Sequence, residues 1–302
     1  MLIGSLYSDV QSQIPGSEAA GRWDLTLQTP EGERASWLEI ERSGVSALVG
    51  RFVGPGGSAR PVSKITYSGL DNLYRFEIPP QWQQSNDYLK VEFSLENDKL
   101  KGWMVFPAGQ KVKWTGSRAP LLRREALPEW GEPIDLLDDK LSEWLIPENN
   151  RFSMEEGILE NAETGGNLIS RQQFDDFKLH VEFRYPEGSN SGIYLRGRYE
   201  VQIEDNYGLP PDDLYIGGIY GFIEPSVNAA KKAGEWQTYD ITLVGRMVNV
   251  WLNGVNVICD RPIPGITGGA LDSDEGSPGP IILQGDHGPV EFRKIVITPA
   301  KK

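Results

Sequence analysis

The chain has 302 residues, which is enough for about two domains that each bury a core of their own. Hydrophobic residues make up 39% and charged residues 24%, a balance that argues against a disordered chain. The formal net charge is −13, and an acidic surface repels phosphate backbones and anionic lipid headgroups. We therefore expect neither nucleic acid nor a membrane surface as a partner.

The single cysteine and the first residues say little about the compartment. Cys259 stands alone, so no internal disulfide and no cysteine-based metal site can form, and its strand-like surroundings predict a core position. No apolar run approaches about 18 residues, so no membrane span is expected, and residues 1–10 do not resemble a signal peptide. Localisation stays open: periplasmic or secreted if a leader has been removed, and cytoplasmic otherwise.

The first half of the chain reads as strands and turns after a short N-terminal arm at residues 1–20. Apolar and polar residues alternate with the two-residue period of half-buried strands. This pattern predicts eight strands, at 23–27, 35–40, 45–53, 62–67, 73–78, 88–95, 99–105 and 111–115. Eight short meandering strands are typical of a small closed barrel, which we expect to span residues 21–118.

Two residues at the ends of this predicted barrel resemble the calycin (lipocalin-like) pattern. Trp23 opens the first strand and Arg118 follows the last one. The resemblance implies that the arginine covers the tryptophan ring in a cation–π contact. An unrelated barrel or sandwich with a core tryptophan would explain the same two residues, so both interpretations remain open.

Strand periodicity lapses at residues 119–133, which hold three prolines and are expected to link two domains. Leu136, Leu137, Leu141 and Trp144 then predict a short turn of helix within 135–144. Further strands are predicted at 152–155, 158–161, 167–170, 177–185, 191–195, 199–203, 238–244, 247–252, 255–258, 281–284 and 290–297. Asn253 and Gly254 are the residues preferred in a two-residue hairpin turn. The predicted fold class is therefore all-β, with a barrel followed by a jelly-roll sandwich at 134–302.

Several strings in the second half are specific. They are FKLHVEFR at 177–184, GSNSGIYLRG at 188–197, YEVQIED at 199–205, GGIYG at 217–221, GEWQTY at 234–239, VWLNG at 250–254 and LQGDHGPVEFR at 283–293. Together they resemble the 3-keto-disaccharide hydrolase family over about residues 134–298, in the family's own order. The resemblance implies a concanavalin A-like lectin/glucanase sandwich and an enzyme that cleaves glycosides already oxidised at C3.

The chemistry that this resemblance implies needs three groups. A ketone at C3 acidifies the proton on C2, so a positioned base can remove it and the enolate can expel the substituent at C1. The reaction needs that base, a donor to the enolate oxygen and an acid for the leaving group. Ordinary glycosidases instead place two carboxylates around an oxocarbenium-like centre. We expect cleavage of 3-keto-glycosides or 3-keto-disaccharides, by elimination or hydrolysis at C1.

Strand alternation predicts a polar face that carries the site. Tyr194 and Arg196 point one way on one strand, and Glu200, Gln202 and Glu204 share a face of the next. An exposed strand face is often polar for no functional reason, so the family-matching strings are what favour a site here.

His287 is the second focus, because it follows Asp286 in a turn between two apolar strands. An imidazole beside a carboxylate can act as base or acid near neutral pH. The other histidine, His180, is expected to be structural, and the acidic run 272–276 is expected to be a solvated loop rather than a calcium site. The catalytic candidates are Glu200, His287, Asp286 and Arg196, and the substrate-binding candidates are Tyr194, Gln202, Glu204, Tyr220, Trp236 and Gln284.

Two classes of function stay open. The sandwich is also the fold of lectins, so a non-catalytic carbohydrate-binding module is the alternative to the enzyme. A hydrolase of unoxidised glucans is disfavoured, because residues 199–205 lack the Glu-x-Asp-x-x-Glu run of the related glucanases. We predict a carbohydrate partner, no cofactor and no metal ligands, while leaving a divalent metal open.

Overall fold

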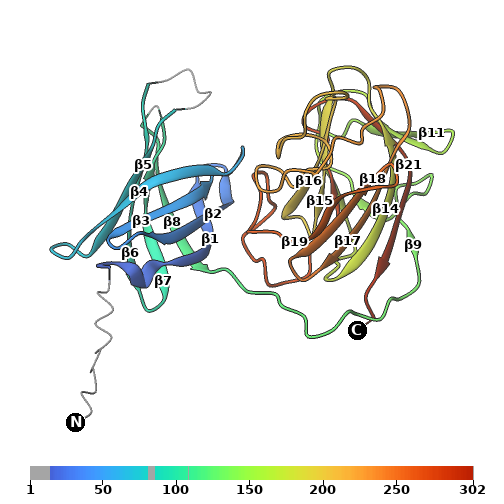
Figure 1. Cartoon of the computed structure of the whole chain (residues 1–302). Coiled ribbons are helices and arrows are strands. Elements are labelled where there is room, and N and C mark those ends of the chain that lie inside the picture. The colour runs from blue at the N-terminus through green and yellow to red at the C-terminus, as the bar shows by residue number, and fades with distance from the viewer. Residues whose placement is uncertain (1–13, 81–85, 108, 302) are drawn as a thin grey trace, which may run out of the picture.

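The computed structural model describes residues 14–80, 86–107 and 109–301, and it is built almost entirely of strands. The only helical element of this described part is the 3-10 helix η1 (Ser17–Ala19). Figure 1 shows two β domains, an N-terminal barrel in blue to green and a C-terminal sandwich in light green to red. The all-β fold class is thus confirmed, while most of the predicted N-terminal arm lies outside the described residues.

The barrel closes in chain order, because each strand pairs with the next and β8 pairs back with β1. Its strands agree in number and order with those predicted from the alternating pattern. They are β1 (Gly21–Thr29), β2 (Gly32–Ser43), β3 (Ala47–Val53), β4 (Arg60–Ser68), β5 (Leu73–Ile78), β6 (Leu89–Glu96), β7 (Lys99–Val105) and β8 (Lys111–Arg118).

Large side chains fill the barrel. Trp23, Phe93 and Trp114 are fully buried in one apolar cluster with aliphatic neighbours from every strand. The Arg118 guanidinium lies 3.9 Å from the centroid of the Trp23 ring, which confirms the expected cation–π contact. Arg118 also donates to the carbonyls of Glu18 and Ala20, so it ties the end of β8 to the start of β1.

The sandwich consists of two facing sheets. The five-stranded sheet has the order β10-β13-β20-β15-β16, and the other has the order β11-β12-β21-β14-β17-β18-β19, with β9 paired to β21 as its eighth strand. The bounds are β9 (Ile134–Asp135), β10 (Trp144–Leu145), β11 (Phe152–Glu155), β12 (Ile158–Asn161), β13 (Leu168–Ser170), β14 (Phe177–Arg184), β15 (Asn190–Leu195), β16 (Tyr199–Glu204), β17 (Gln237–Val244), β18 (Met247–Leu252), β19 (Val255–Pro262), β20 (Ile282–Leu283) and β21 (Val290–Pro299).

Two local predictions in the sandwich were wrong, and one was confirmed. The helix predicted within 135–144 is absent: Leu136 is buried in an irregular segment after β9, Trp144 is buried at the start of β10, and the Trp144 indole donates to the Leu136 carbonyl. Cys259 is exposed on β19 rather than in the core, since only one face of that edge strand is covered. The Asn253-Gly254 hairpin turn is confirmed, with φ of 52° and 80° at the two residues.

The segment between the domains is held against the sandwich. Arg246 donates to the Pro120 carbonyl, Arg124 pairs with Asp176, and the Gly131 amide donates to the Pro299 carbonyl. In Figure 1 this green segment leaves β8 and runs along the sandwich to β9. Its prolines therefore mark an extended strap rather than a free tether.

The barrel also packs directly on the sandwich through β2. Six successive residues of this strand, 35–40, are buried, so both of its faces are covered. Leu38 and Ile40 face the barrel core, whereas Ala35 and Trp37 join the core cluster of the sandwich. The Trp37 ring meets the Phe222 ring edge-on at 5.2 Å between centroids. The two domains thus share a packed apolar interface.

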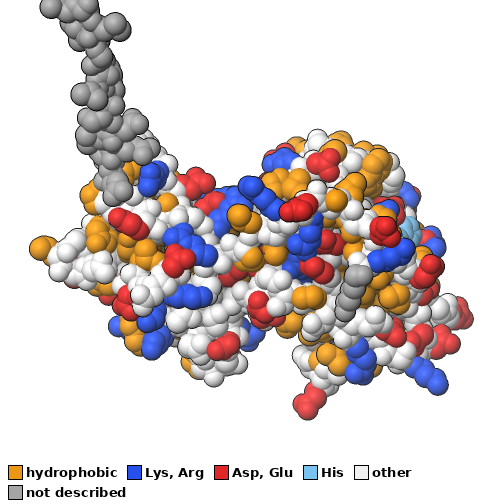
Figure 2. Space-filling model, turned by 90° about the horizontal axis from the view of Figure 1, so that it is seen from below, with side chains coloured by type: hydrophobic (Ala, Val, Ile, Leu, Met, Phe, Trp, Pro, Cys, Tyr) orange, Lys and Arg blue, Asp and Glu red, His pale blue; other side chains and the backbone are white. Residues whose placement is uncertain are grey.

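The charge of the surface is mixed. On the face shown in Figure 2, acidic and basic side chains are interspersed rather than gathered into single-sign patches. Among the described residues, no helix is long and apolar enough to cross a membrane.

Candidate functional site

The polar face predicted from strand alternation exists on the five-stranded sheet. Tyr194 pairs with Glu200 across β15 and β16, and Gly192 pairs with Gln202. Residues paired directly across two strands point to the same face. The intervening pair, Ile193 with Val201, is buried in the core between the sheets. Tyr194, Glu200 and Gln202 therefore lie together on the side that faces away from the core.

Glu200 is the centre of this face. Its side chain is only 4% exposed, and its carboxyl lies 3.0 Å from the Tyr194 hydroxyl. Gly192 lies directly beside the Glu200 carboxyl. A Cβ at this position would lie only 2.4 Å from a carboxyl oxygen, so glycine leaves the room that the carboxyl occupies. Burial raises the pKa of Glu200 to about 8, and the Tyr194 hydroxyl and the His287 charge lower it only in part. At neutral pH Glu200 is thus mostly a neutral acid.

His287 and Asp286 form the second titratable pair. The imidazole Nδ1 lies 2.8 Å from an Asp286 oxygen, and both side chains are about half exposed. The hydrogen bond to Asp286 raises the pKa of His287 and lowers that of Asp286. Because Asp286 occupies Nδ1, the imidazole keeps Nε2 for exchange of a proton. The turn is held next to Glu200, because the Gln284 amide donates to the Gly192 carbonyl.

The other expected binding residues take different positions around Glu200. Tyr220 is half-buried, its amide donates to the Glu200 carbonyl, and burial and Glu200 both raise its pKa. Gln284 is 5% exposed, and its Oε1 is buried without a hydrogen-bond partner in the described part of the chain. Glu204 lies four residues further along β16, half-buried, with a pKa raised by burial. The Gln202 side chain donates through Nε2 to the Leu214 carbonyl and accepts through Oε1 from the Ile203 backbone amide. It therefore supports the nearby loop.

Arg196 does not share this face, so that expectation was wrong. β15 ends at Leu195, and Arg196 takes a positive φ of 53°, which breaks the alternation. Its fully buried guanidinium instead donates to the carbonyls of Glu275 and Ser277. It also lies 6.0 Å from the ring of Tyr199, whose strand position faces the core.

Trp236 is likewise remote from Glu200. The guanidinium groups of Arg184 and Arg293 lie 4.8 and 4.3 Å from its ring. Both arginines belong to the outer face of the eight-stranded sheet, because Phe183 and Phe292 beside them are buried in the core. His180 lies on the same outer face and pairs with Asp240, which is consistent with a structural role.

The acidic loop 272–276 is solvated only in part, since Asp274 is exposed as expected whereas Glu275 is buried. Glu275 is 1% exposed, pairs with Arg246, and accepts a hydrogen bond of 2.5 Å from the Tyr199 hydroxyl. Asp24 of the barrel joins this cluster, and burial together with the Glu275 charge raises its pKa to about 9. The loop therefore meets the barrel in a buried cluster of ionisable groups.

Two residues of the site were missed from the sequence. They are Thr267, whose hydroxyl accepts a hydrogen bond of 3.0 Å from the Glu200 backbone amide, and Gly268, whose carbonyl lies 3.0 Å from the Tyr194 hydroxyl. Both sit in the Gly/Pro-rich loop after β19, and only the Gly268-Gly269 pair hinted at a close approach of backbone.

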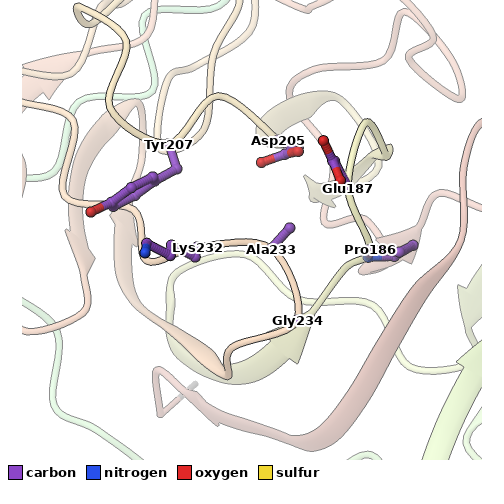
Figure 3. A pocket seen from close by; sticks show the side chains of 7 residues that line it. All are labelled: Pro186, Glu187, Asp205, Tyr207, Lys232, Ala233 and Gly234. Carbon is purple, nitrogen blue, oxygen red and sulfur yellow. The ribbon is translucent and has the colours of Figure 1, made fainter.

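A separate open pocket of about 480 Å³ lies beyond the end of β16. Figure 3 shows its lining, with Tyr207 and Lys232 on one side and Glu187 and Asp205 on the other. The Asp205 carboxylate already accepts the Gly188 amide. Asp205 is five residues from Glu200, roughly 16 Å along an extended strand, so this pocket is distinct from the Glu200 site. Within the described ranges, no group of three or more His, Cys, Asp or Glu side chains could hold a metal ion.

Comparison with known proteins adds the family. The family described as the 3-keto-alpha-glucoside-1,2-lyase-like domain matches residues 132–298, as the sequence strings predicted. A Parabacteroides distasonis structure, described as a proposed glycosyl hydrolase, is 33% identical with a TM-score of 0.49 and covers 55% of this chain and 82% of its own. A second proposed glycosyl hydrolase from that organism is 25% identical with a TM-score of 0.46, covering 55% and 98%. The search of curated proteins found no match.

Proposed function

Because this chain belongs to the 3-keto-alpha-glucoside-1,2-lyase-like family, and is thus an enzyme of the hydrolase or lyase type, we propose that it cleaves 3-keto-glycosides at C1. The observation that carries the proposal is the buried Glu200, held by Tyr194 beside the Asp286–His287 pair. A site that only binds a sugar has no need for a carboxyl whose pKa burial raises to about 8.

The two groups divide the work by their protonation. Asp286 holds the imidazole through Nδ1, so neutral His287 offers Nε2 as the base that takes the C2 proton. Glu200, neutral at pH 7, then protonates the oxygen that leaves C1. In this proposal a hydroxyl or amide beside them contacts the sugar, with Tyr220 and the Gln284 side chain, whose Oε1 has no hydrogen-bond partner among the described residues, as the candidates.

This assignment fixes the expected pH profile. The base must be neutral, so activity rises with pH through the pKa of His287, which Asp286 raises above its ordinary 6.5. The acid must keep its proton, so activity falls as pH rises through the Glu200 pKa of about 8. The two limits give a bell-shaped profile with its maximum between these two pKa values.

The test compares a 3-keto-disaccharide with its unoxidised parent and measures the monosaccharide released. We expect release from the 3-keto substrate alone, and a loss on the order of a hundredfold in Glu200→Gln. Glu160→Gln, on β12 of the other sheet, is the matched control and should keep full activity. Binding of the 3-keto-disaccharide without release by the unchanged protein would instead identify a lectin-like module.

A further inference from the structure

One loop of the barrel reaches the backbone that holds the Glu200 site. This loop, residues 54–59, joins β3 to β4 and carries the Pro55 carbonyl, which accepts the Gly269 amide at 3.0 Å. Just before this loop, the guanidinium group of Arg51 on β3 lies 5.6 Å from the centroid of the Phe222 ring, which is a second contact with the sandwich. Phe222 comes two residues after Tyr220, so the barrel contacts both loops that border Glu200.

The fit of this loop against the sandwich leaves no space. A Cβ on Gly268 would lie 2.2 Å from the Gly57 carbonyl oxygen, and a Cβ on Gly221 would lie 2.7 Å from the Ser58 Cβ. Such distances are too short for any side chain, so only glycine allows the two backbones to approach this closely. The position of the Gly268-Gly269 segment is therefore set by the barrel.

A single peptide group connects that contact to the site. The carbonyl of Gly268 is the partner of the Tyr194 hydroxyl, at 3.0 Å, and the amide of the same peptide unit is the Gly269 N–H that donates to Pro55. Because a peptide unit is planar and rigid, its carbonyl and its amide move together. Hydrogen bonds in series also polarise one another. The chain of contacts runs from Pro55 through this peptide and Tyr194 to Glu200.

The Tyr194 hydroxyl has only one proton for two acceptors. When Glu200 is neutral it can donate to the Tyr194 oxygen, while Tyr194 donates to the Gly268 carbonyl. When Glu200 is ionised, Tyr194 must turn its proton to the carboxylate and leave the Gly268 carbonyl unpaired, which is costly in a buried site. A fixed Gly268 carbonyl therefore favours the neutral form of Glu200.

We propose that the N-terminal barrel is a positioning element of the active site: its loop 54–59 fixes the Gly268–Gly269 peptide, which holds Tyr194 against Glu200 and limits how far the Tyr194 hydroxyl can stabilise the ionised carboxylate. This inference rests on the proposed function for its kinetic consequence, although the chain of contacts exists without substrate. Pro55 and Gly268 are positioning residues, since they act on the reaction only through Tyr194 and Glu200.

The test uses a wedge in the full-length chain. Gly268→Ala places a methyl group against the Gly57 backbone, whereas Gly56→Ala, in the same loop, meets nothing within 4 Å and is the matched control. Deletion of Gly56 and Gly57 shortens the barrel loop and removes its contact with Gly268, while the sandwich sequence stays unchanged. This second variant tests the inference if Gly268→Ala does not fold. Faster hydrogen exchange of the Gly269 amide reports that the bond to Pro55 is lost.

Two readouts separate positioning from general stability. The first is the titration of Glu200 without substrate, followed by NMR of ¹³C-labelled glutamate carboxyls and assigned with Glu200→Gln. We expect its midpoint to move to lower pH in both loop variants and to stay unchanged in Gly56→Ala. The second is turnover of a 3-keto-disaccharide, where we expect a loss on the order of tenfold to a hundredfold and a descending limb at lower pH.

The outcomes are distinguishable. If the Gly269 amide is freed while the Glu200 midpoint stays where it is, the barrel does not position the site and the inference is overturned. If the unchanged protein does not cleave the substrate, the proposed function fails, but the titration still decides whether the barrel acts on Glu200.

Discussion

Glu200 should make the protein less stable as the pH rises, and its replacement should remove that effect. The folded pKa is about 8, against 4.5 for an ordinary glutamate, so the folded state keeps a proton that the unfolded state has released. A carboxyl with a raised pKa lowers stability progressively above its unfolded value and completes the loss above its folded value. The window for Glu200 therefore runs from about pH 4.5 to about pH 8.

The size of the effect follows from the same two values. Each pKa unit corresponds to about 1.4 kcal/mol, so ionised Glu200 costs the folded state on the order of 5 kcal/mol above pH 8. Glu200→Gln keeps an acceptor for the Tyr194 hydroxyl and carries no charge at any pH. We expect the variant to gain several kcal/mol on the unchanged protein between pH 5 and pH 9, while losing activity.

Urea unfolding at pH 5 and pH 9, followed by tryptophan fluorescence, measures this difference. Asp24 has a pKa raised to about 9 and contributes in the same direction, so the comparison must be between proteins that both keep Asp24. Glu160→Gln, which removes one carboxyl from the other sheet, again serves as the matched control. An equal stability difference between Glu200→Gln and the unchanged protein at both pH values would show that Glu200 ionises freely in the folded state.

Three further results are expected. Asp286→Asn removes the bond that raises the pKa of His287, so the ascending limb of the rate profile should move to lower pH; an unmoved limb would exclude His287 as the base. Tyr194→Phe removes a hydrogen bond that lowers the pKa of Glu200, so the descending limb should move to higher pH, measured in the same assay. Glu275→Leu leaves Arg246 buried without its carboxylate partner and should lower the free energy of unfolding by about 3–5 kcal/mol in urea; a change below about 1 kcal/mol would contradict the buried pair.

Local alternation was enough to predict the barrel strands and most sandwich strands, because burial of one strand face shows as alternation in adjacent residues. It missed the two-residue strands β9 and β10, which are too short to show a period. It also placed Tyr194 and Glu200 on one face, since both lie inside regular strands. It failed for Arg196 as soon as the strand ended in a positive φ, where the two-residue period no longer applies.

The remaining errors come from contacts between distant segments. Glu275 lies in a loop of polar and acidic residues, whose local sequence predicts exposure. Its burial comes from contacts with Arg246 and Tyr199, which are far away in the sequence. Trp37 reads as an ordinary strand residue of the barrel, yet it packs into the sandwich. The role of Gly268 is a backbone contact with another domain, which a glycine in a loop cannot reveal by itself.

Because Trp23 near the start of β1 pairs with Arg118 at the end of β8, the two chain ends of the barrel lie side by side. A unit whose two ends meet can be circularly permuted, or exchanged as a cassette, without stretching the rest of the chain. A new opening in the exposed turn around Leu70, with residues 14–20 kept in the peptide that joins Arg118 to Gly21, should preserve the barrel. An exchanged barrel would lack the close backbone contact between Gly57 and Gly268. A replacement barrel therefore has to reproduce this contact to pack against the sandwich in the same way.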